Sequence, residues 1–215
     1  MPALNREKII ERLNFGDLYV APIFEPDRQI GPVSIDLRLG TVALTARARG
    51  LSHVDPRVFQ TLADSREHAF EEAKQQKLDR YDIPFNNPLL VHPGQLTLVP
   101  TLEWIETPVD LLGYVTARSS WAREGLSIAT ATLINPGYRG LITLELANLG
   151  QIPIKLYPGM RIAQIAFHRI EVGDNTKRPA KSQFDLAFEP KSGKFWEGDE
   201  KFIPPIEQTR YPRSS

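Results

Sequence analysis

The chain has 215 residues, and its 26 basic and 26 acidic side chains give a formal net charge of zero. This balance provides no overall field for nucleic acid or an anionic membrane, so an anionic ligand has to meet a local cluster of donors. Cysteine is absent, which excludes disulfides, a cysteine nucleophile and every thiolate metal site. No apolar run approaches the ~20 residues of a membrane-spanning helix, and the N-terminus lacks a signal-peptide pattern. We therefore expect a soluble cytoplasmic protein.

The N-terminal residues predict a short supporting helix. Asn5 is a suitable N-cap and Gly16 a suitable C-terminal stop. Between them, Ile9, Ile10 and Leu13 fall on one face of the helix.

Residues 31–40 predict a strand, because apolar and polar residues alternate there between two glycines. The period of two indicates a half-buried strand. Asp36 and Arg38 share its polar side, where they pair with each other or line a subunit contact. A solvated strand face is the simpler interpretation of the same pattern.

Residues 55–78 differ in character and predict one or two surface helices inserted in a β-protein. Their apolar side chains recur at roughly helical spacing, as Val58, Leu62, Ala69, Phe70 and Ala73. We favour an amphipathic helix that lies on its own domain, with a partner-binding helix as the alternative.

From Leu89 to Ile170 the chain is a series of short strands separated by turn residues. This pattern is typical of an antiparallel sandwich or jelly roll rather than of βαβ units. The expected strands are Leu96–Val99, Leu112–Thr116, Leu141–Ala147, Ile152–Leu156 and Ile162–Ile170, with turns at Pro93-Gly94, Pro136-Gly137, Gly150 and Pro158-Gly159. We predict a mainly β domain over residues 1–170, with a helical insertion at about 55–80. Residues 171–215 lose the pattern and are expected to become ordered only by packing on another surface.

Within this series, Arg118, Ser119, Ser120 and Arg123 form a dense group of anion-binding donors. Two guanidinium groups can hold phosphate in a bidentate way, and the hydroxyl and backbone N–H groups can add to the contact. If the chain turns helically after Ser119, this residue and Arg123 share one face. A Ser-rich turn next to a structural Arg–Glu pair explains the residues equally well.

Glu145 is the one carboxylate in the apolar strand that runs from Leu141 to Leu146. A glutamate in such a strand is costly unless it is paired. It is therefore either neutralised by a partner such as Arg123 or held for proton transfer.

The sequence predicts no protein-bound metal. Its four histidines are scattered, without H-E-x-x-H or paired ligand spacing. It contains no G-x-S-x-G elbow, no phosphate-binding P-loop and no G-x-G-x-x-G fingerprint. The zinc deaminase signature requires cysteines that this chain lacks.

Several of these motifs, in their order along the chain, resemble the dCTP deaminase family of the trimeric dUTPase superfamily. The resemblance covers most of residues 5–170. It rests on residues 34–40 (Ser-Ile-Asp-Leu-Arg-Leu-Gly), His92-Pro93-Gly94, Arg118–Arg123 with Gly125-Leu126, residues 134–140 (Ile-Asn-Pro-Gly-Tyr-Arg-Gly), residues 142–145 (Ile-Thr-Leu-Glu) and Pro158-Gly159-Met160-x-Ile162.

The resemblance implies a dUTPase-like distorted β-sandwich and deamination of dCTP to dUTP without zinc. Glu145 is then the proton shuttle, and Arg123 and Ser119 position and polarise the site. Magnesium comes with the triphosphate. The resemblance also implies a homotrimer with sites between subunits, and a C-terminal tail, 171–215, that closes over the nucleotide. Nucleotide contacts are implied for Arg118, Ser119, Ser120, Arg123, Thr130, Ala131, Thr132, Asn135, Tyr138, Gln164 and Lys194.

The chain departs from the family at several positions. Its hairpin between Leu126 and Gly137 is one residue shorter and lacks the family's His-x-Thr-Ala sequence. Asn135 replaces the usual aspartate facing the sugar, which keeps an acceptor and adds a donor. The hairpin length fits dUTPases, but Ile128 occupies the position of their water-activating aspartate. Two alternatives stay open: a bifunctional deaminase–diphosphatase or related nucleotide hydrolase, and a non-catalytic nucleotide-binding regulatory trimer.

Overall fold

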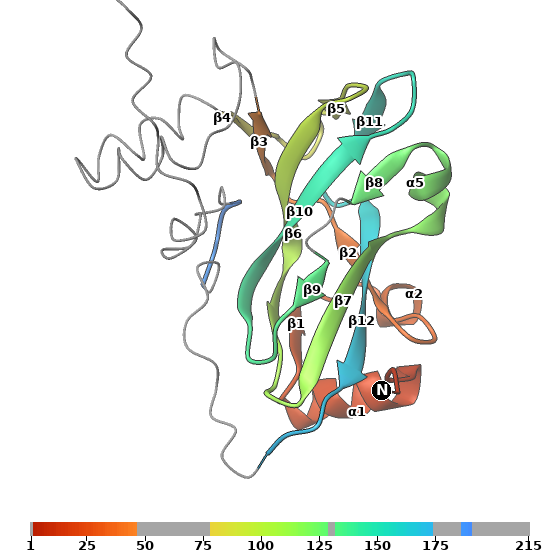
Figure 1. Cartoon of the computed structure of the whole chain (residues 1–215), viewed down its shortest axis with the longest axis vertical. Coiled ribbons are helices and arrows are strands. Elements are labelled where there is room, and N and C mark those ends of the chain that lie inside the picture. Colours follow the sequence, from red (N-terminus) through yellow and green to blue (C-terminus); the bar gives the residue numbers. More distant parts are fainter. Residues whose placement is uncertain (1, 47–77, 129–131, 174–185, 191–215) are drawn as a thin grey trace, which may run out of the picture. The chain divides into compact units, whose positions relative to one another are not determined.

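The computed structural model describes residues 2–46, 78–128, 132–173 and 186–190, which form two facing antiparallel sheets and short helices (Figure 1). The larger sheet has the strand order β4-β3-β6-β10-β8, with β1 also paired to β6. The bounds of its strands are Tyr19–Ala21 (β1), Val42–Ala46 (β3), Leu78–Asp82 (β4), Leu96–Glu106 (β6), Leu126–Ile128 (β8) and Arg139–Asn148 (β10).

The second sheet has the order β2-β12-β7-β9, and a two-stranded ribbon pairs β11 with β5. The bounds are Ile35–Arg38 (β2), Leu89–Val91 (β5), Leu111–Ala117 (β7), Leu133–Ile134 (β9), Ile154–Leu156 (β11) and Arg161–Arg169 (β12). Alternate residues of β10 and β7 are buried, so each sheet supplies one apolar face to the core. The mainly β sandwich is confirmed, and each of the five predicted strands has a counterpart in the structure.

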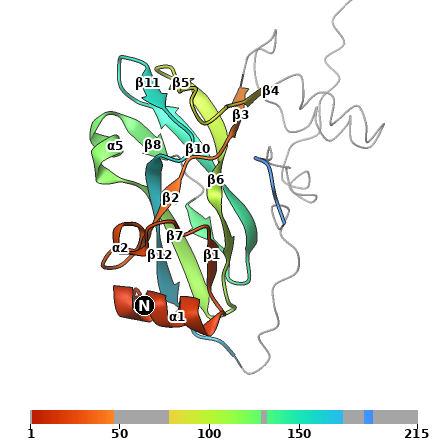
Figure 2. The same ribbon diagram turned by 180° about the vertical axis from the view of Figure 1, so that it is seen from behind.

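The predicted N-terminal helix is also confirmed, as α1 (Arg6–Phe15). The Asn5 side chain accepts a hydrogen bond of 3.0 Å from the backbone N–H of Lys8. Gly16 ends the helix with φ +85°, a left-handed conformation that glycine adopts without strain. Ile9 is fully buried. In both views, α1 lies at the end of the sandwich where β12 ends and β7 begins (Figures 1 and 2).

The prediction of a half-buried strand with a solvated face at residues 31–40 is wrong. All four residues of β2 are buried, including Asp36 and Arg38 at 8% exposure each. The second short helix, α2 (Pro26–Gln29), and the residues before it contact β2. Phe24, for example, lies 5.1 Å from the Arg38 guanidinium carbon. A period of two cannot reveal this cover, because the covering residues come from another segment.

Most of the predicted helical insertion lies outside the described residues, and Leu78–Asp82, where we expected it to end, is strand β4. No helix in the described part of the chain is long and apolar enough to span a bilayer. The predicted cytoplasmic location stays a prediction.

Of the C-terminal segment, residues 171–173 and 186–190 are described, and the second stretch lies beside β10. The Ala187 carbonyl accepts a hydrogen bond of 2.9 Å from the Leu141 N–H. The Phe188 and Trp104 rings are 4.9 Å apart between centroids. The division into a domain and a closing tail stays a prediction.

Candidate functional site

The predicted group of donors lies on the turn that joins β7 to β8. The chain forms the short helix α5 (Ser119–Arg123) there, so the condition under which Ser119 and Arg123 share one face is met. The carbonyl of Arg118 accepts hydrogen bonds of 3.0 Å from the N–H groups of Trp121 and Ala122. Ser119, Ser120 and Arg123 are exposed, and Arg118 is half-buried. Three of the four predicted anion-binding side chains are therefore open to solvent.

Two hydrogen bonds hold α5 against the start of β12. The Arg118 N–H donates to the Ile162 carbonyl at 3.0 Å, and the Trp121 indole N–H donates to the Arg161 carbonyl at 3.2 Å. The Trp121 ring also packs against the core. Because both bonds end on backbone atoms of β12, the position of the turn is fixed by the second sheet.

A close backbone approach fixes the other end of the turn. Gly125 has φ +90°, and a Cβ atom at this position would lie 2.7 Å from the backbone nitrogen of Gly150. Only glycine fits both the conformation and the space. This close backbone contact ties the end of the α5 turn to the residues that follow β10.

Asp36 of β2 lies behind the turn and contacts two arginines. Its Oδ1 is 3.3 Å from Arg118 Nε, and its Oδ2 accepts a hydrogen bond of 3.1 Å from Arg161 Nη1. Burial raises the pKa of Asp36 above its ordinary value, while the positive charges of both arginines oppose the shift. Asp36 and Arg38, which we expected to pair or to face solvent, have different partners.

The partner of Arg38 is Glu103 of β6, and this pair is buried. Glu103 is fully buried and accepts hydrogen bonds from the Arg38 backbone N–H at 2.8 Å and from Arg38 Nη1 at 3.0 Å. The Gln29 side-chain amide adds a third, also 3.0 Å long. This network joins β2 to the larger sheet directly beside Asp36.

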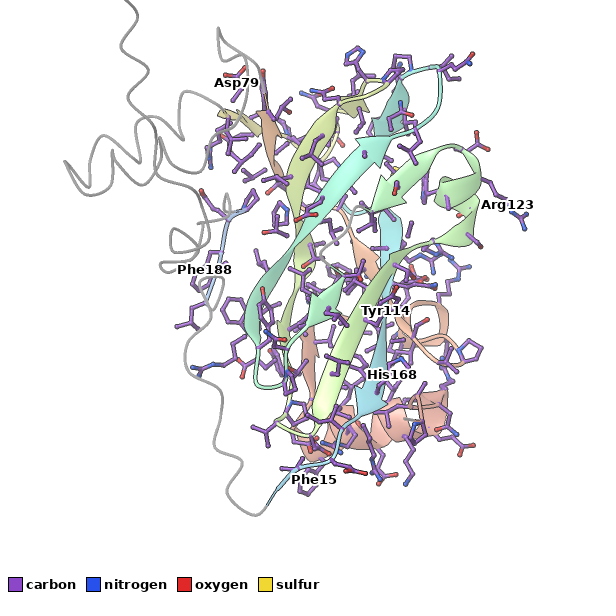
Figure 3. The ribbon with its side chains drawn as sticks, viewed as in Figure 1. Phe15, Asp79, Tyr114, Arg123, His168 and Phe188 are labelled. Carbon is purple, nitrogen blue, oxygen red and sulfur yellow. The ribbon has the colours of Figure 1, made fainter. Side chains whose placement is uncertain are left out.

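Glu145 and Arg123 do not form an ion pair within the chain. Glu145 is half-buried on β10, opposite Leu98 of β6 and next in sequence to Leu146, which pairs with Ile128 of β8. The Arg123 side chain extends away from the ribbon (Figure 3), and no residue in the described ranges forms an ion pair with it. The structural Arg–Glu pair that we considered from the sequence is therefore not formed by these two residues in a single chain.

The hairpin residues with predicted nucleotide contacts lie around β9. Thr132 is half-buried, and its carbonyl accepts a hydrogen bond of 2.8 Å from the Val115 N–H. Asn135 is exposed, so its side-chain amide is accessible to a ligand. The Tyr138 hydroxyl donates to the Leu141 carbonyl at 2.7 Å. Thr130, Ala131 and Lys194 lie outside the described residues.

Gln164 lies on β12 between two partners. Its Cα is in register with Asp36 of β2 on one side and with Thr116 of β7 on the other. Its side-chain N–H donates to the Thr116 hydroxyl at 3.2 Å. The structure thus places Gln164 beside Asp36 and the Arg118 turn, on one sheet.

Arg161 was not identified as a site residue from the sequence. Arg161 is the residue written x in the motif Pro158-Gly159-Met160-x-Ile162. The pairing of β12 with β2 shifts register directly after Arg161, and both Ile162 and Ala163 are buried. Such an irregularity breaks the period of two. The sequence therefore held no signal that Arg161 and Asp36 would meet.

Comparison with known proteins gives consistent results. Residues 3–170 match the model of a family described as dCTP deaminase-like. The chain is 36% identical over 168 residues to a protein of Dictyoglomus thermophilum named dCTP deaminase, dUMP-forming, covering 78% of this chain and 80% of that protein. It is 39% identical over 177 residues to a dCTP deaminase of Halorubrum lacusprofundi, covering 82% and 80%.

A solved structure is also similar. The crystal structure of 2'-deoxycytidine 5'-triphosphate deaminase from Agrobacterium tumefaciens matches with a TM-score of 0.55 and 25% identity. The match covers 79% of this chain and 48% of that one, so the chain spans about half the length of the solved protein.

Proposed function

Because this chain belongs to the dCTP deaminase-like family, we propose that it hydrolyses the 4-amino group of dCTP, with dUTP and ammonia as products. The observation that carries the proposal is the exposed α5 turn, which presents Ser119, Ser120 and Arg123 next to the half-buried Arg118. The turn lies within the residues that match the family model. Its guanidinium and hydroxyl donors suit the triphosphate of such a substrate.

Glu145 is the proposed proton shuttle. A water oxygen bonds to C4 of cytosine while the Glu145 carboxylate accepts a proton from that water. Glu145 then gives this proton to N3 of the base, the proton of the new C4 hydroxyl passes to N4, the C4–N4 bond breaks, and ammonia leaves as C4 becomes a carbonyl. A half-buried carboxylate on a strand within the sheet supports this role, because general acid–base catalysis requires a fixed geometry. Ser119 and Arg123 position and polarise the reacting group in this proposal.

We propose that the active protein is a homotrimer with each site between subunits. The support is that Arg123 points away from its own domain and forms no ion pair with any residue in the described ranges. Residues that are apart within one chain can meet across such an interface. Exposed apolar side chains, including Phe24 at 63% and Leu133 at 60%, offer surface for the contact. Closure of the tail 171–215 over the nucleotide belongs to the same proposal.

Magnesium enters, in this proposal, with the nucleotide. The proposed phosphate-binding side chains of the α5 turn are arginines and serines, which suit phosphate rather than a hard cation. Among the residues that the structure describes, no group of three or more His, Cys, Asp or Glu side chains is placed to hold a metal ion. In this proposal the ion contacts phosphate oxygens of the nucleotide rather than a cage of protein ligands.

The test is incubation of the purified protein with magnesium and each deoxy- and ribonucleoside triphosphate, with chromatography of the products. Conversion of dCTP to dUTP with equimolar ammonia is the expected result. Formation of dUMP and pyrophosphate would mean that the enzyme also cleaves the triphosphate; the Dictyoglomus relative is named dUMP-forming. If every nucleotide is recovered unchanged while one of them raises the melting temperature, the protein is a binding module and the proposal is wrong.

A further inference from the structure

The two carboxylate oxygens of Asp36 contact the guanidinium groups of two different arginines. Oδ1 lies 3.3 Å from Arg118 Nε, and Oδ2 accepts a hydrogen bond of 3.1 Å from Arg161 Nη1. The same Nη1 donates to the backbone carbonyl of Arg28 at 2.7 Å, so Arg161 is itself fixed. Only 12% of the Asp36 side chain is exposed. The carboxylate is therefore held in one orientation by two cations.

The contact to Arg118 leaves the end of that side chain available. Asp36 contacts the Nε atom of Arg118, and among the described residues no acceptor is bonded to the two Nη groups of Arg118. One third of the Arg118 side chain, 33%, is exposed. A guanidinium fixed through Nε presents its two Nη groups as a planar fork, which matches two phosphate oxygens.

We propose that Asp36 is a positioning residue, anchored by Arg161, that holds Arg118 ready to bind the triphosphate of the substrate. This inference rests on the proposed function, and it identifies a residue that acts on the site through Arg118. Asp36 contacts the arginine and not the nucleotide. Its benefit is entropic, because an arginine that is already ordered loses less side-chain freedom when the phosphate binds.

Strand register brings these groups together. Gln164 of β12 is paired with Asp36 on one side and with Thr116 on the other. Arg118 follows Thr116 by two residues and so falls on the same face of the sheet. The register shift directly after Arg161 allows this residue to reach the face that carries Gln164. Asp36 and Arg161 lie on strands of this sheet, and Arg118 directly follows the last residue of β7.

Positioning and simple electrostatics predict opposite effects for Asp36→Asn. Arg118, Arg161 and Asp36 together carry one net positive charge, and the substitution would leave two. If Asp36 acted only through its charge, its loss would strengthen the binding of an anion. If it positions Arg118, its loss weakens binding in spite of the added positive charge.

The test compares the full-length wild type with Asp36→Asn by calorimetry, using dCTP with magnesium and, separately, inorganic triphosphate. We expect both dissociation constants to rise about tenfold, since the ion pair that orients Arg118 is lost. In steady-state kinetics, KM for dCTP should rise by a similar factor while kcat changes less than about threefold. A general structural defect would not separate the two constants in this way.

The matched control is Asp110→Asn. Asp110 is also a partly buried aspartate paired with an arginine, since it accepts two hydrogen bonds from Arg12. It lies at the opposite end of β7 from Arg118, where α1 contacts the sheet. This variant should lose stability but leave both dissociation constants unchanged.

A double-mutant cycle shows whether Asp36 acts through Arg118. In an Arg118→Gln background, Asp36→Asn should change the dissociation constant for inorganic triphosphate less than about twofold. Fully additive effects of the two substitutions would overturn the inference. So would an Asp36→Asn protein that binds triphosphate as tightly as the wild type, or more tightly.

The triphosphate measurement separates the two proposals. A wild type that binds inorganic triphosphate but leaves dCTP unchanged contradicts the proposed function, while the Asp36 comparison keeps its meaning. If the wild type deaminates dCTP and Asp36→Asn has the same KM for dCTP as the wild type, only the proposed role of Asp36 is contradicted. A wild type that binds neither ligand contradicts both.

Discussion

Replacing Glu103 by glutamine should destabilise the folded protein by about 3–5 kcal/mol, the usual range when one partner of a buried ion pair is removed. The reason lies in the donors around the carboxylate. Oε1 faces N–H groups of Gln29 and Arg38 at 3.0 Å, and Oε2 faces the Arg38 backbone N–H at 2.8 Å. An amide has one NH2 group, and either orientation directs it at a donor. The Arg38 side chain, 10% exposed, would also lose its counter-charge.

The assay is urea and thermal unfolding of Glu103→Gln and wild type, followed by circular dichroism. For a chain of this size, 1 kcal/mol corresponds to a shift of about 2–4 °C, so the midpoint should fall by about 6–20 °C. The control is Asp27→Asn, because Asp27 is paired with Arg6 but is fully exposed, and its loss should leave the midpoint unchanged. A destabilisation of Glu103→Gln below about 1 kcal/mol would refute the reasoning.

Three further predictions concern the active site, acid stability and the α5 turn. Glu145→Gln should lower kcat by about 10²–10⁴-fold, as expected for loss of a general base, while dCTP binding measured by calorimetry changes little. The Arg12 hydrogen bonds lower the pKa of Asp110. The stabilising contribution of Asp110 is therefore present at neutral pH and is lost as the pH falls through that pKa. Asp110→Asn should lower the free energy of unfolding by about 1 kcal/mol at pH 7 after solvent screening, and should not change it in strong acid. Gly125→Ala should lower the melting temperature and weaken dCTP binding, because the new Cβ would lie 2.7 Å from the Gly150 backbone.

Each of these predictions has a contrary outcome. Equal loss of binding and turnover in Glu145→Gln would indicate a structural glutamate. A stability difference between Asp110→Asn and wild type that persists at low pH would exclude the titration of Asp110 as its source. For Gly125→Ala the control is Gly94→Ala, which shares a positive φ but has no atom within 4 Å of the added Cβ. If the two variants lose the same stability, the steric contact with the backbone is unimportant.

Local features of the fold could be predicted from the sequence, because they depend on residues close together in the chain. Asn5 and Gly16 satisfy the backbone at the two ends of α1 without help from elsewhere. The apolar run Leu141–Ala147, which is followed by the turn residue Gly150, predicts strand β10.

The predicted ends of the strands were less accurate than the prediction that the strands exist. Residues 96–99 were expected to form a short strand, but β6 continues to Glu106. Pro100 lies inside it and suggested an end, since proline cannot donate to a ladder. The strand continues because its neighbours β10, β3 and β1 pair along its length, which the sequence of β6 alone does not contain.

The sequence by itself determined the mainly β class, and it indicated the residues that we propose to carry the chemistry, namely the donors at 118–123 and the carboxylate at 145. Only the tertiary structure decided how they are supported. In the folded protein Asp36 and Arg38 are both buried. Asp36 forms ion pairs with Arg118 and Arg161, and Arg38 forms one with Glu103. These partners are far apart in the chain, and their meeting depends on strand register and on a bulge. Hydrophobic periodicity reports which face of a strand is buried, but it carries no information on which distant strand lies alongside.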